Sequence, residues 1–457
     1  MAEAQPDPAD QLPIRSDDEL LEVFRGAEKP PDAWRIGAEG EKFGVDASTG
    51  APLQYEGERG VLRIFSQLTA RHGWEPEVET PGGPVISLRR GKARVTLEPG
   101  AQLELSGAPL PDVHAICAEM RGHLHELRAI SHEMNLAWLG VGFHPFARHE
   151  DLPWVPKHRY AIMKNYLPTR GAGGLDMMRR TATVQANFDW SSEEDAMRKL
   201  CMTLRLSPLT NAMFANSPLY EGHLAGCKSR RGKVWLEMDP SRSGLIPSLW
   251  GKKRPGYRDY AEWALDGGMF LFKRGDEYIA NTGQTFRSFL REGFHGHRAT
   301  HGDWKLHLST LFPEVRMKTT LEMRACDSQS TDLACGISAV YAGLLYDSQA
   351  LDRAEALAQT LSYADVQAAR LALVTDGLAA SIGGRPAREL AEQVLDIASS
   401  GLERRARLNS RGKDERIHLA RLAALTQAGH SPADQLVEGL DPNDPNFRRE
   451  LLARAQL

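Results

Sequence analysis

The sequence predicts an α+β fold in which helices pack around an antiparallel β-sheet. Residues 34–107 contain short β-prone segments in which apolar and polar residues alternate, with Gly and Pro between them. Residues 111–135 instead place Ile116, Leu124 and Leu127 at helical spacing. Because strands and helices do not alternate as regular βαβ units, an antiparallel sheet is favoured over a parallel one.

The individual elements can be justified in order along the chain. Ser16 stands before three acidic residues and an apolar run, a pattern typical of the N-cap of a short helix. Residues 333–346 form an uncharged apolar run that predicts a buried helix, because it is shorter than the roughly 20 residues of a membrane span. The other predicted elements are strands within residues 34–46, 93–107, 136–146, 181–190 and 317–327, and a helix over residues 191–209.

Three regions follow from changes in composition along the chain. Residues 1–15 are acidic and rich in Pro, which predicts a disordered tail. Residues 16–350 hold all the predicted strands and form the α+β domain. Residues 351–457 are rich in Ala, Leu, Arg and Glu at helical spacing, and we expect a helical layer packed on the same unit.

The overall composition excludes several classes of function. The chain has 457 residues and a net charge of −4, so a protein that coats nucleic acid or an anionic membrane is not expected. The N-terminal segment shows neither an export signal nor a transit pattern, and we therefore expect a cytoplasmic location. Motifs for a P-loop, a dinucleotide-binding turn, a zincin and a serine-hydrolase elbow are all absent from the sequence. The five cysteines contain no Cys-x-x-Cys pair, which argues against a zinc ribbon.

Acidic residues recur at even spacing in otherwise apolar predicted strands, so they share one face of each strand. Each of them alone is more often found on a solvated face, but several on one semi-buried sheet need compensating cations. Arginine can supply that charge, and hard divalent ions with oxygen ligands are the other solution. The residues concerned are Glu39 and Glu41, Glu98 and Glu104, and Glu322 beside Arg324, with Gln185 on a further strand.

The chain resembles the plant-type glutamate–cysteine ligases, which also occur in bacteria. The matching text is RIGAEGEKFG, LEPGAQLELSG, PKHRYAIMKNYLP, GLDMMRRTATVQANFDW, FANSPLYEG, LFPEVRMKTTLEMRACD and GLERR. The resemblance runs from about residue 20 to about residue 440. It implies a glutamine-synthetase-like fold, with a curved antiparallel sheet shaped as a half-funnel. It also implies ATP-dependent joining of the γ-carboxylate of L-glutamate to the amine of L-cysteine through γ-glutamyl phosphate, the first step of glutathione biosynthesis.

The resemblance also assigns roles to residues of this chain. Arg324 would stabilise the transferring phosphoryl group, and Arg159 and Arg231 would bind the substrate. Arg180 is a further substrate-binding candidate, with a surface salt bridge as its equal alternative. Two or three Mg²⁺ ions, which Mn²⁺ can replace, would be held by Glu39, Glu41, Glu98, Glu104, Gln185 and Glu322.

The cysteines depart from the plant pattern. Cys117 and Cys335 match one of its two redox-linked pairs, whereas the other pair is missing, with Asn281 at one of its positions. A Cys117–Cys335 disulfide and two free thiols both stay open, and a reduced cytosol favours the thiols. We expect a monomer or a weak homodimer.

Two other functions remain open from the sequence. One is a related ligase that joins glutamate to a different amine. The other is a non-catalytic nucleotide-binding or redox-sensing homologue, which the retention of every acidic motif position disfavours.

Overall fold

The computed structural model describes residues 8–275 and 277–457 and contains a nine-stranded sheet in the order β14-β15-β7-β1-β5-β4-β3-β2, with β6 also paired to β1. Every pair of neighbouring strands in this sheet is antiparallel, so the predicted α+β class is confirmed. The strands are β1 (Ile36–Asp46), β2 (Glu75–Val78), β3 (Val85–Arg90), β4 (Ala93–Leu97), β5 (Leu103–Ser106), β6 (Leu136–Leu139), β7 (Val184–Phe188), β14 (Val315–Met317) and β15 (Leu321–Met323).

The long strand β1 is the centre of the sheet because it pairs with three other strands. Its first half lies between β7 and β5, and its second half pairs with β6. Ile36 and Ala38 point into the apolar core, whereas Glu39 and Glu41 alternate with them and stay half-buried on the opposite face. The alternation in the sequence therefore separates an apolar face from an acidic one.

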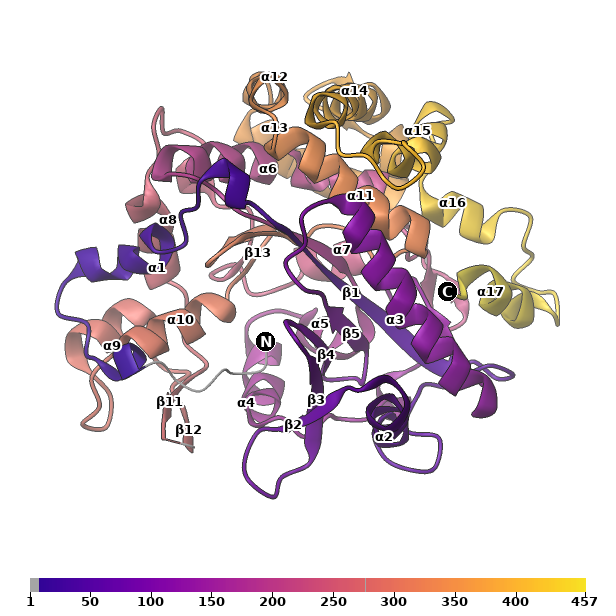
Figure 1. Cartoon of the computed structure of the whole chain (residues 1–457), viewed down its shortest axis with the longest axis horizontal. Helices are drawn as coiled ribbons and strands as arrows, with labels where there is room; N and C mark the ends of the chain where they lie inside the picture. The colour runs from indigo at the N-terminus through magenta and orange to yellow at the C-terminus, as the bar shows by residue number, and fades with distance from the viewer. Residues whose placement is uncertain (1–7, 276) are drawn as a thin grey trace.

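Helices cover the apolar face of the sheet and form its core. In Figure 1, α3 (Val113–Glu133) runs beside β1, and α6 (Glu193–Met213) and α11 (Thr331–Leu345) lie above the sheet. The run predicted to be a buried helix is α11, in which every residue from Leu333 to Leu345 is buried. Within the described part of the chain, no helix is long and apolar enough to cross a membrane.

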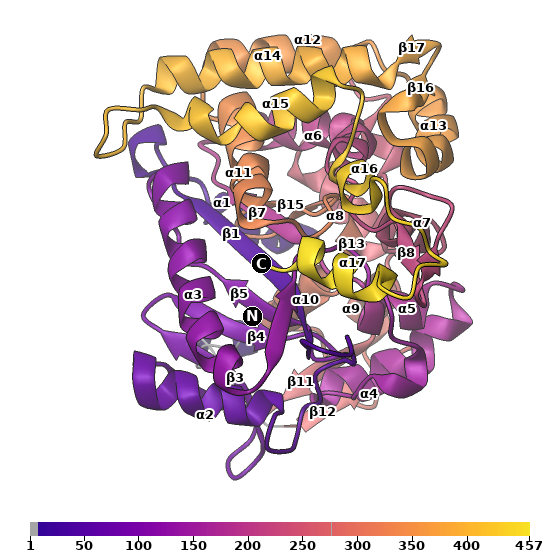
Figure 2. The same ribbon diagram turned by 90° about the vertical axis from the view of Figure 1, so that its right-hand side faces the viewer.

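The C-terminal region adds a further layer of helices beyond α6 and α11. Figure 2 shows α12 (Ser348–Gln359), α14 (Ala387–Arg405) and α15 (Ala420–Gln427) stacked at the top of the molecule. One hydrophobic cluster extends from Leu20 to Leu425 and includes residues of both the sheet and this layer. The layer also contains α13 (Tyr363–Asp376), whereas α16 (Pro432–Val437) and α17 (Phe447–Ala455) contribute to a separate cluster with Phe43 and Val45 of β1 and Leu139 of β6.

The remaining elements lie around the edges of this core. The helices are α1 (Glu22–Arg25), α2 (Val61–His72), α4 (His158–Tyr166), α5 (Gly174–Arg180), α7 (Arg230–Leu236), α8 (Tyr257–Leu265), α9 (Phe286–Glu292) and α10 (His301–Ser309). Two-stranded pairs are formed by β8 (Leu219–Tyr220) and β9 (His223–Leu224), β10 (Ser243–Gly244) and β13 (Phe312–Pro313), β11 (Leu271–Arg274) and β12 (Glu277–Ala280), and β16 (Ser381–Ile382) and β17 (Arg385–Pro386).

The N-terminal segment differs in part from the expected disordered tail. Residues 8–11 form a short 3₁₀ helix, and Asp10 is ion-paired with Lys305 at 2.6 Å. The Ile14 N–H donates to the Ala299 carbonyl at 3.0 Å. Residues 8–15 are thus held against α10 by specific contacts, whereas residues 1–7 of the predicted tail lie outside the described residues.

Two of the predicted single strands are instead hairpins. Residues 93–107 divide into β4 and β5, and the turn between them contains Ala101 with a φ of +66°. Residues 317–327 contribute only the end of β14, a turn at Lys318–Thr320 and the strand β15. Even spacing across these segments therefore does not place Glu98 and Glu104 on one strand.

Candidate active site

The acidic residues of β1 meet further oxygen-bearing side chains on both neighbouring strands. Glu41 lies directly opposite Glu104 of β5, and Glu39 lies directly opposite Gln185 of β7. Directly opposed residues of an antiparallel pair point to the same face. Asn187, two residues beyond Gln185, donates from its Nδ2 to the Glu39 carboxylate at 3.1 Å.

Glu98 joins this face from the turn between β4 and β5. Thr96 lies opposite Glu104 and donates to its carboxylate at 3.0 Å. The charge of Glu104 acts on Glu98, so the two carboxyl groups are neighbours although they do not lie on one strand. Lys157 and Arg159, at the start of α4, are the cations whose charge acts on Glu98.

Glu322 is bound by cations in this structure rather than left as a free ligand. It is fully buried on β15, opposite Asn187, and it is ion-paired with Arg316 at 2.7 Å and Lys318 at 2.8 Å. Arg324 also pairs with Glu322, and its Nη1 donates to Gln185 Oε1 at 2.9 Å. A metal ion could use Glu322 only by replacing one of these ion pairs.

Burial and mutual repulsion shape the electrostatics of the face. Desolvation, together with the charges of Glu322 and Glu104, raises the pKa of Glu39 to about 7. Desolvation and neighbouring carboxylates also raise the pKa values of Glu41 and Glu98. The pKa of Glu322 is instead held well below its usual range, because the charges of Arg316, Lys318 and Arg324 outweigh its burial.

The donor set of this face fits divalent magnesium. Three carboxyl groups with raised pKa values lack enough positive charge, and a divalent cation would supply it. Among the described residues, no three carboxylates bring oxygen atoms within 4.8 Å of one another. Magnesium accepts such an arrangement, because it is commonly held by one or two carboxylates, with water and substrate phosphates completing its shell.

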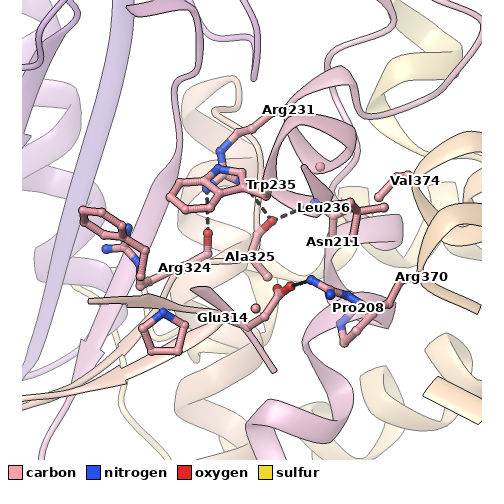
Figure 3. Close-up of a pocket in the computed structure, with 14 residues that line it drawn as sticks. Pro208, Asn211, Arg231, Trp235, Leu236, Glu314, Arg324, Ala325, Arg370 and Val374 are labelled. Carbon is pink, nitrogen blue, oxygen red and sulfur yellow. Dashed lines mark hydrogen bonds and ion pairs between the residues drawn. The ribbon is translucent and has the colours of Figure 1, made fainter. Parts of the chain in front are cut away.

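A pocket lies beside the Glu322 end of the acidic face (Figure 3). Trp235 and Phe312 line it together with Arg324, whose guanidinium carbon lies 5.9 and 5.8 Å from their ring centres. Arg231, on α7, also lines the pocket and donates to the carbonyls of Arg324 at 2.8 Å and Ala325 at 3.0 Å. The pocket thus combines an apolar wall with three arginines, Arg231, Arg324 and Arg370.

The other two predicted arginines occupy different surroundings. Arg159 is half-buried, and its pKa is raised because Tyr160 and Glu98 outweigh the effect of burial. Arg180 is 1% exposed and is paired with Asp176 at 3.2 Å and Glu221 at 3.1 Å. Its charge is already neutralised by these two carboxylates, which favours the salt-bridge alternative over substrate binding.

Several residues that the structure brings into the site were not predicted from the sequence. Arg316 and Lys318 belong to the VRMK text just before Glu322, and their spacing by two was a usable signal once a hairpin was considered. Asn211 of α6 lines the pocket and donates to the Ala325 carbonyl at 2.7 Å. Nothing in the local sequence marks Asn211, because α6 meets the pocket only in the folded chain.

Comparisons with known proteins match most of the chain. Residues 35–453 match glutamate–cysteine ligase family 2. The chloroplastic glutamate–cysteine ligase of Brassica juncea is 38% identical over 93% of this chain and 81% of the relative, and that of Arabidopsis thaliana is 39% identical over 93% and 80%. A crystal structure of glutamate–cysteine ligase from Francisella tularensis in complex with AMP has a similar fold, with a TM-score of 0.51 and 12% identity, over 92% of this chain and 87% of that one.

The family match and the plant relatives therefore define the chain as a ligase, and its fold is similar to that of the Francisella tularensis enzyme. The chain belongs to the glutamate–cysteine ligase family.

Proposed function

We propose that the chain joins the γ-carboxylate of L-glutamate to the amine of L-cysteine at the expense of ATP, through γ-glutamyl phosphate, as the first step of glutathione biosynthesis. The observation that carries this proposal is the acidic face of β1, β5 and β7, which adjoins a pocket containing Arg231 and Arg324. Phosphoryl transfer to a carboxylate brings two anions together, so a site for it must hold cations in fixed positions.

The acidic face would hold the magnesium ions. Glu39, Glu41, Glu98 and Glu104 are the main ligands in this proposal, Gln185 adds a neutral oxygen, and Glu322 joins them if one of its ion pairs opens. When bound, Mg²⁺ or Mn²⁺ would neutralise phosphate charge during transfer. Two or three ions suit the spread of these carboxylates along three strands better than a single compact site does.

The arginines would position and stabilise the reacting groups. Arg324 is fixed by Glu322 and Gln185 at the end of the acidic face, where it would stabilise the transferring phosphoryl group. Arg231 lines the adjoining pocket and would anchor a carboxylate of glutamate. Arg159 would act at the Glu98 end, and Arg180 is the weakest of the four assignments because of its own ion pairs.

The identity of the acceptor amine is the main point to test. ATP-dependent phosphate release should be measured with L-glutamate and a panel of amines, in the presence of Mg²⁺. We expect turnover with L-cysteine to exceed that with L-alanine or other small amines by at least about tenfold, the effect of 1.4 kcal/mol of differential binding. Equal rates for all amines would favour the related ligase, and an absence of release with any amine would favour the non-catalytic homologue.

Location and assembly complete the proposal. We propose a cytoplasmic enzyme that acts as a monomer or a weak homodimer, without nucleic acid or membrane partners. The plant relatives are described as chloroplastic, so fractionation of cells that express this chain is the direct measurement of its location.

A further inference from the structure

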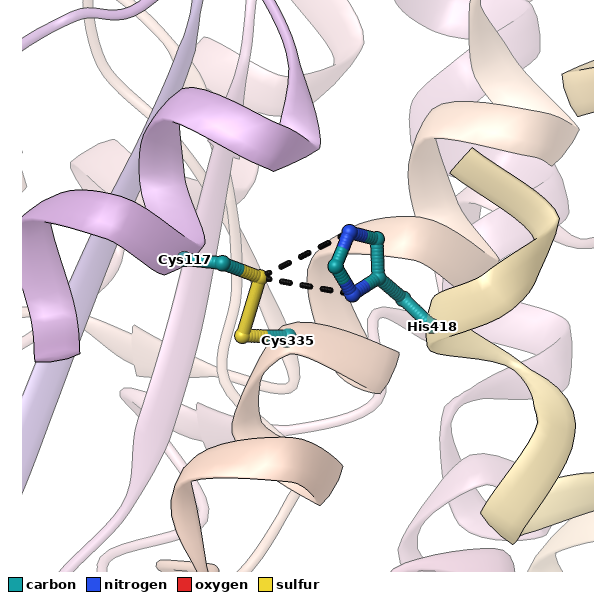
Figure 4. Close-up of side chains that lie close together, drawn as sticks. All are labelled: Cys117, Cys335 and His418. Atoms are coloured by element: carbon teal, nitrogen blue, oxygen red, sulfur yellow. Dashed lines mark hydrogen bonds between the residues drawn. A yellow bond between two sulfur atoms is a disulfide. The ribbon is translucent and has the colours of Figure 1, made fainter. Parts of the chain in front are cut away.

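Three elements far apart in the sequence bring two cysteines and a histidine together outside the acidic face. Cys117 lies on α3, Cys335 on α11, and His418 at the end of the 3₁₀ helix η8 (Glu415–His418). Figure 4 shows their side chains converging between these elements. Among the described residues, this is the one group of three His, Cys, Asp or Glu side chains whose ligand atoms all lie within 4.8 Å of one another.

In the structure the two sulfur atoms are joined as a disulfide, with 5.7 Å between the Cα atoms. Both cysteines are buried, and His418 is half-buried at the side that faces solvent. His418 lies against the disulfide, with its Nδ1 3.5 Å from Cys117 Sγ. Two thiolates and a neutral imidazole can bind one metal ion together, whereas a disulfide supplies no thiolate ligand.

A second histidine fixes the orientation of His418. His114 Nε2 lies 3.2 Å from the Arg407 carbonyl, which can only accept, so this nitrogen of His114 carries the proton. His114 Nδ1 then accepts from His418 Nε2 at 3.0 Å. His418 Nδ1 therefore carries the lone pair, and it is the nearer of the two ring nitrogens to Cys117 Sγ, at 3.5 Å compared with 3.9 Å for Nε2.

This relay is the arrangement of a metal-binding histidine. Ligating histidines usually donate their other ring nitrogen to a neighbouring acceptor, which fixes the tautomer and raises the basicity of the ligand. A neutral imidazole beside two sulfurs suits a borderline-soft divalent cation.

We propose that the reduced protein binds one thiophilic divalent cation, of the Zn²⁺ class, through Cys117 Sγ, Cys335 Sγ and His418 Nδ1. His114 is the positioning residue, and water entering at the half-exposed His418 takes the fourth place. Around a tetrahedral ion with Zn–S bonds of about 2.3 Å the two sulfurs lie about 3.8 Å apart, so the disulfide bond must be reduced before the ion can bind.

The disulfide and the metal site exclude each other. A dithiol reductant first transfers two electrons and two protons to the disulfide, giving two thiols and an oxidised reductant. The cation then replaces the two thiol protons, which are released to solvent as two metal–sulfur bonds form. Both states link α3 to α11, and the metal-bound state also ties η8 to them.

The local sequence gives no sign of this site. Zinc motifs are recognised from cysteines a few residues apart, whereas Cys117, Cys335 and His418 are brought together only by the packing of α3, α11 and η8. The absence of a Cys-x-x-Cys pair therefore excludes a zinc ribbon but not this arrangement.

The test uses the full-length protein, reduced with a phosphine, desalted without oxygen and titrated with Co²⁺ in excess Mg²⁺. The excess Mg²⁺ competes with Co²⁺ for oxygen ligands, and only thiolate ligation gives a sulfur-to-cobalt charge-transfer absorption. We expect one equivalent of Co²⁺ per chain, displacement by Zn²⁺, and release of two protons per ion in a weakly buffered indicator solution. The diamide-oxidised protein should show no such absorption.

Variants decide which residues bind the ion. Cys117→Ser and His418→Ala should each weaken Co²⁺ binding at least about tenfold, whereas Cys201→Ser, a cysteine of α6 outside the cluster, should bind like the parent. Circular dichroism confirms that each variant is folded. The proposal is overturned if the reduced parent shows no charge-transfer absorption, or if folded Cys117→Ser and His418→Ala retain it at full strength.

Discussion

At the scale of single residues, the acidic face combines carboxyl groups that are compensated with others that are not. Glu322 is surrounded by Arg316, Lys318 and Arg324, and its pKa is held low. Glu39 has Asn187 as its direct hydrogen-bond partner and a pKa raised to about 7. The difference explains why a divalent cation would bind on the β1 side, where charge is missing, before it competes for Glu322.

The raised pKa of Glu39 predicts a pH-dependent effect of Mg²⁺ on stability. Between the usual Glu pKa of 4.5 and about 7, the folded chain keeps a proton that the unfolded chain releases, so the free energy of unfolding falls as pH rises through this range. Mg²⁺ binds the deprotonated carboxylate and offsets this loss. We expect Mg²⁺ to raise the Tm more at pH 8 than at pH 6, as measured by scanning calorimetry.

Two substitutions separate this effect from general ion binding. Glu39→Gln should remove much of the difference between pH 6 and pH 8 and should also abolish ATP-dependent phosphate release. Glu58→Gln, at an exposed position before α2, is the matched control and should behave like the parent. An equal gain in Tm at both pH values in the parent would show that Glu39 does not bind the ion.

At the scale of elements, the two hairpins contain turns that could not be predicted from the sequence. Alternation correctly identified acidic strands, but it did not locate the turns after Leu97 and Met317. Turn positions depend on which strand finds a partner, and that is decided by the packing of the whole sheet. The Arg316–Glu322 ion pair is a direct product of the β14–β15 turn and was missed for this reason.

Two Gly→Ala substitutions, one at the crossing of α11 and α14 and one on the exposed side of α3, should have opposite effects on stability. Gly343 of α11 meets the α14 backbone, and a Cβ at Gly343 would overlap the Ala398 carbonyl oxygen. Gly122 on α3 is exposed and has open space around its Cβ position. We expect Gly343→Ala to destabilise the protein by about 1–3 kcal/mol through overpacking. Gly122→Ala should stabilise it by about 0.5–1 kcal/mol, because alanine is the better helix former.

Urea unfolding of both variants and the parent, under the same reducing conditions, measures the two effects. The crossing would not depend on the missing Cβ if Gly343→Ala unfolded at the same urea concentration as Gly122→Ala, or at a higher one.

At the scale of the whole molecule, the sequence predicted the α+β class and the acidic strands but not the three-dimensional neighbours of the site. The site residues of β1 and β7 could be predicted because apolar and polar residues alternate along these strands. Asn211, Arg370 and Val374 reach the pocket from α6 and α13, whose local sequences contain no motif that marks a site. Their position depends on how the helices pack over the sheet, and residue spacing within one helix does not predict that packing.

The same packing makes the folding of residues 1–350 depend on the helices of the C-terminal layer. The apolar cluster is continuous from Leu20 to Leu425, and Arg370 of α13 pairs with Glu314 beside the pocket. A fragment of residues 1–350 would expose the face of α11 that now packs on α14, so we expect it not to fold cooperatively and to release no phosphate from ATP. Co-expression with residues 351–457 as a separate chain is the matched control, and it should restore a single thermal transition in circular dichroism together with turnover. A fragment of residues 1–350 that melts cooperatively and is active by itself would instead make the helical layer an independent addition to a complete enzyme.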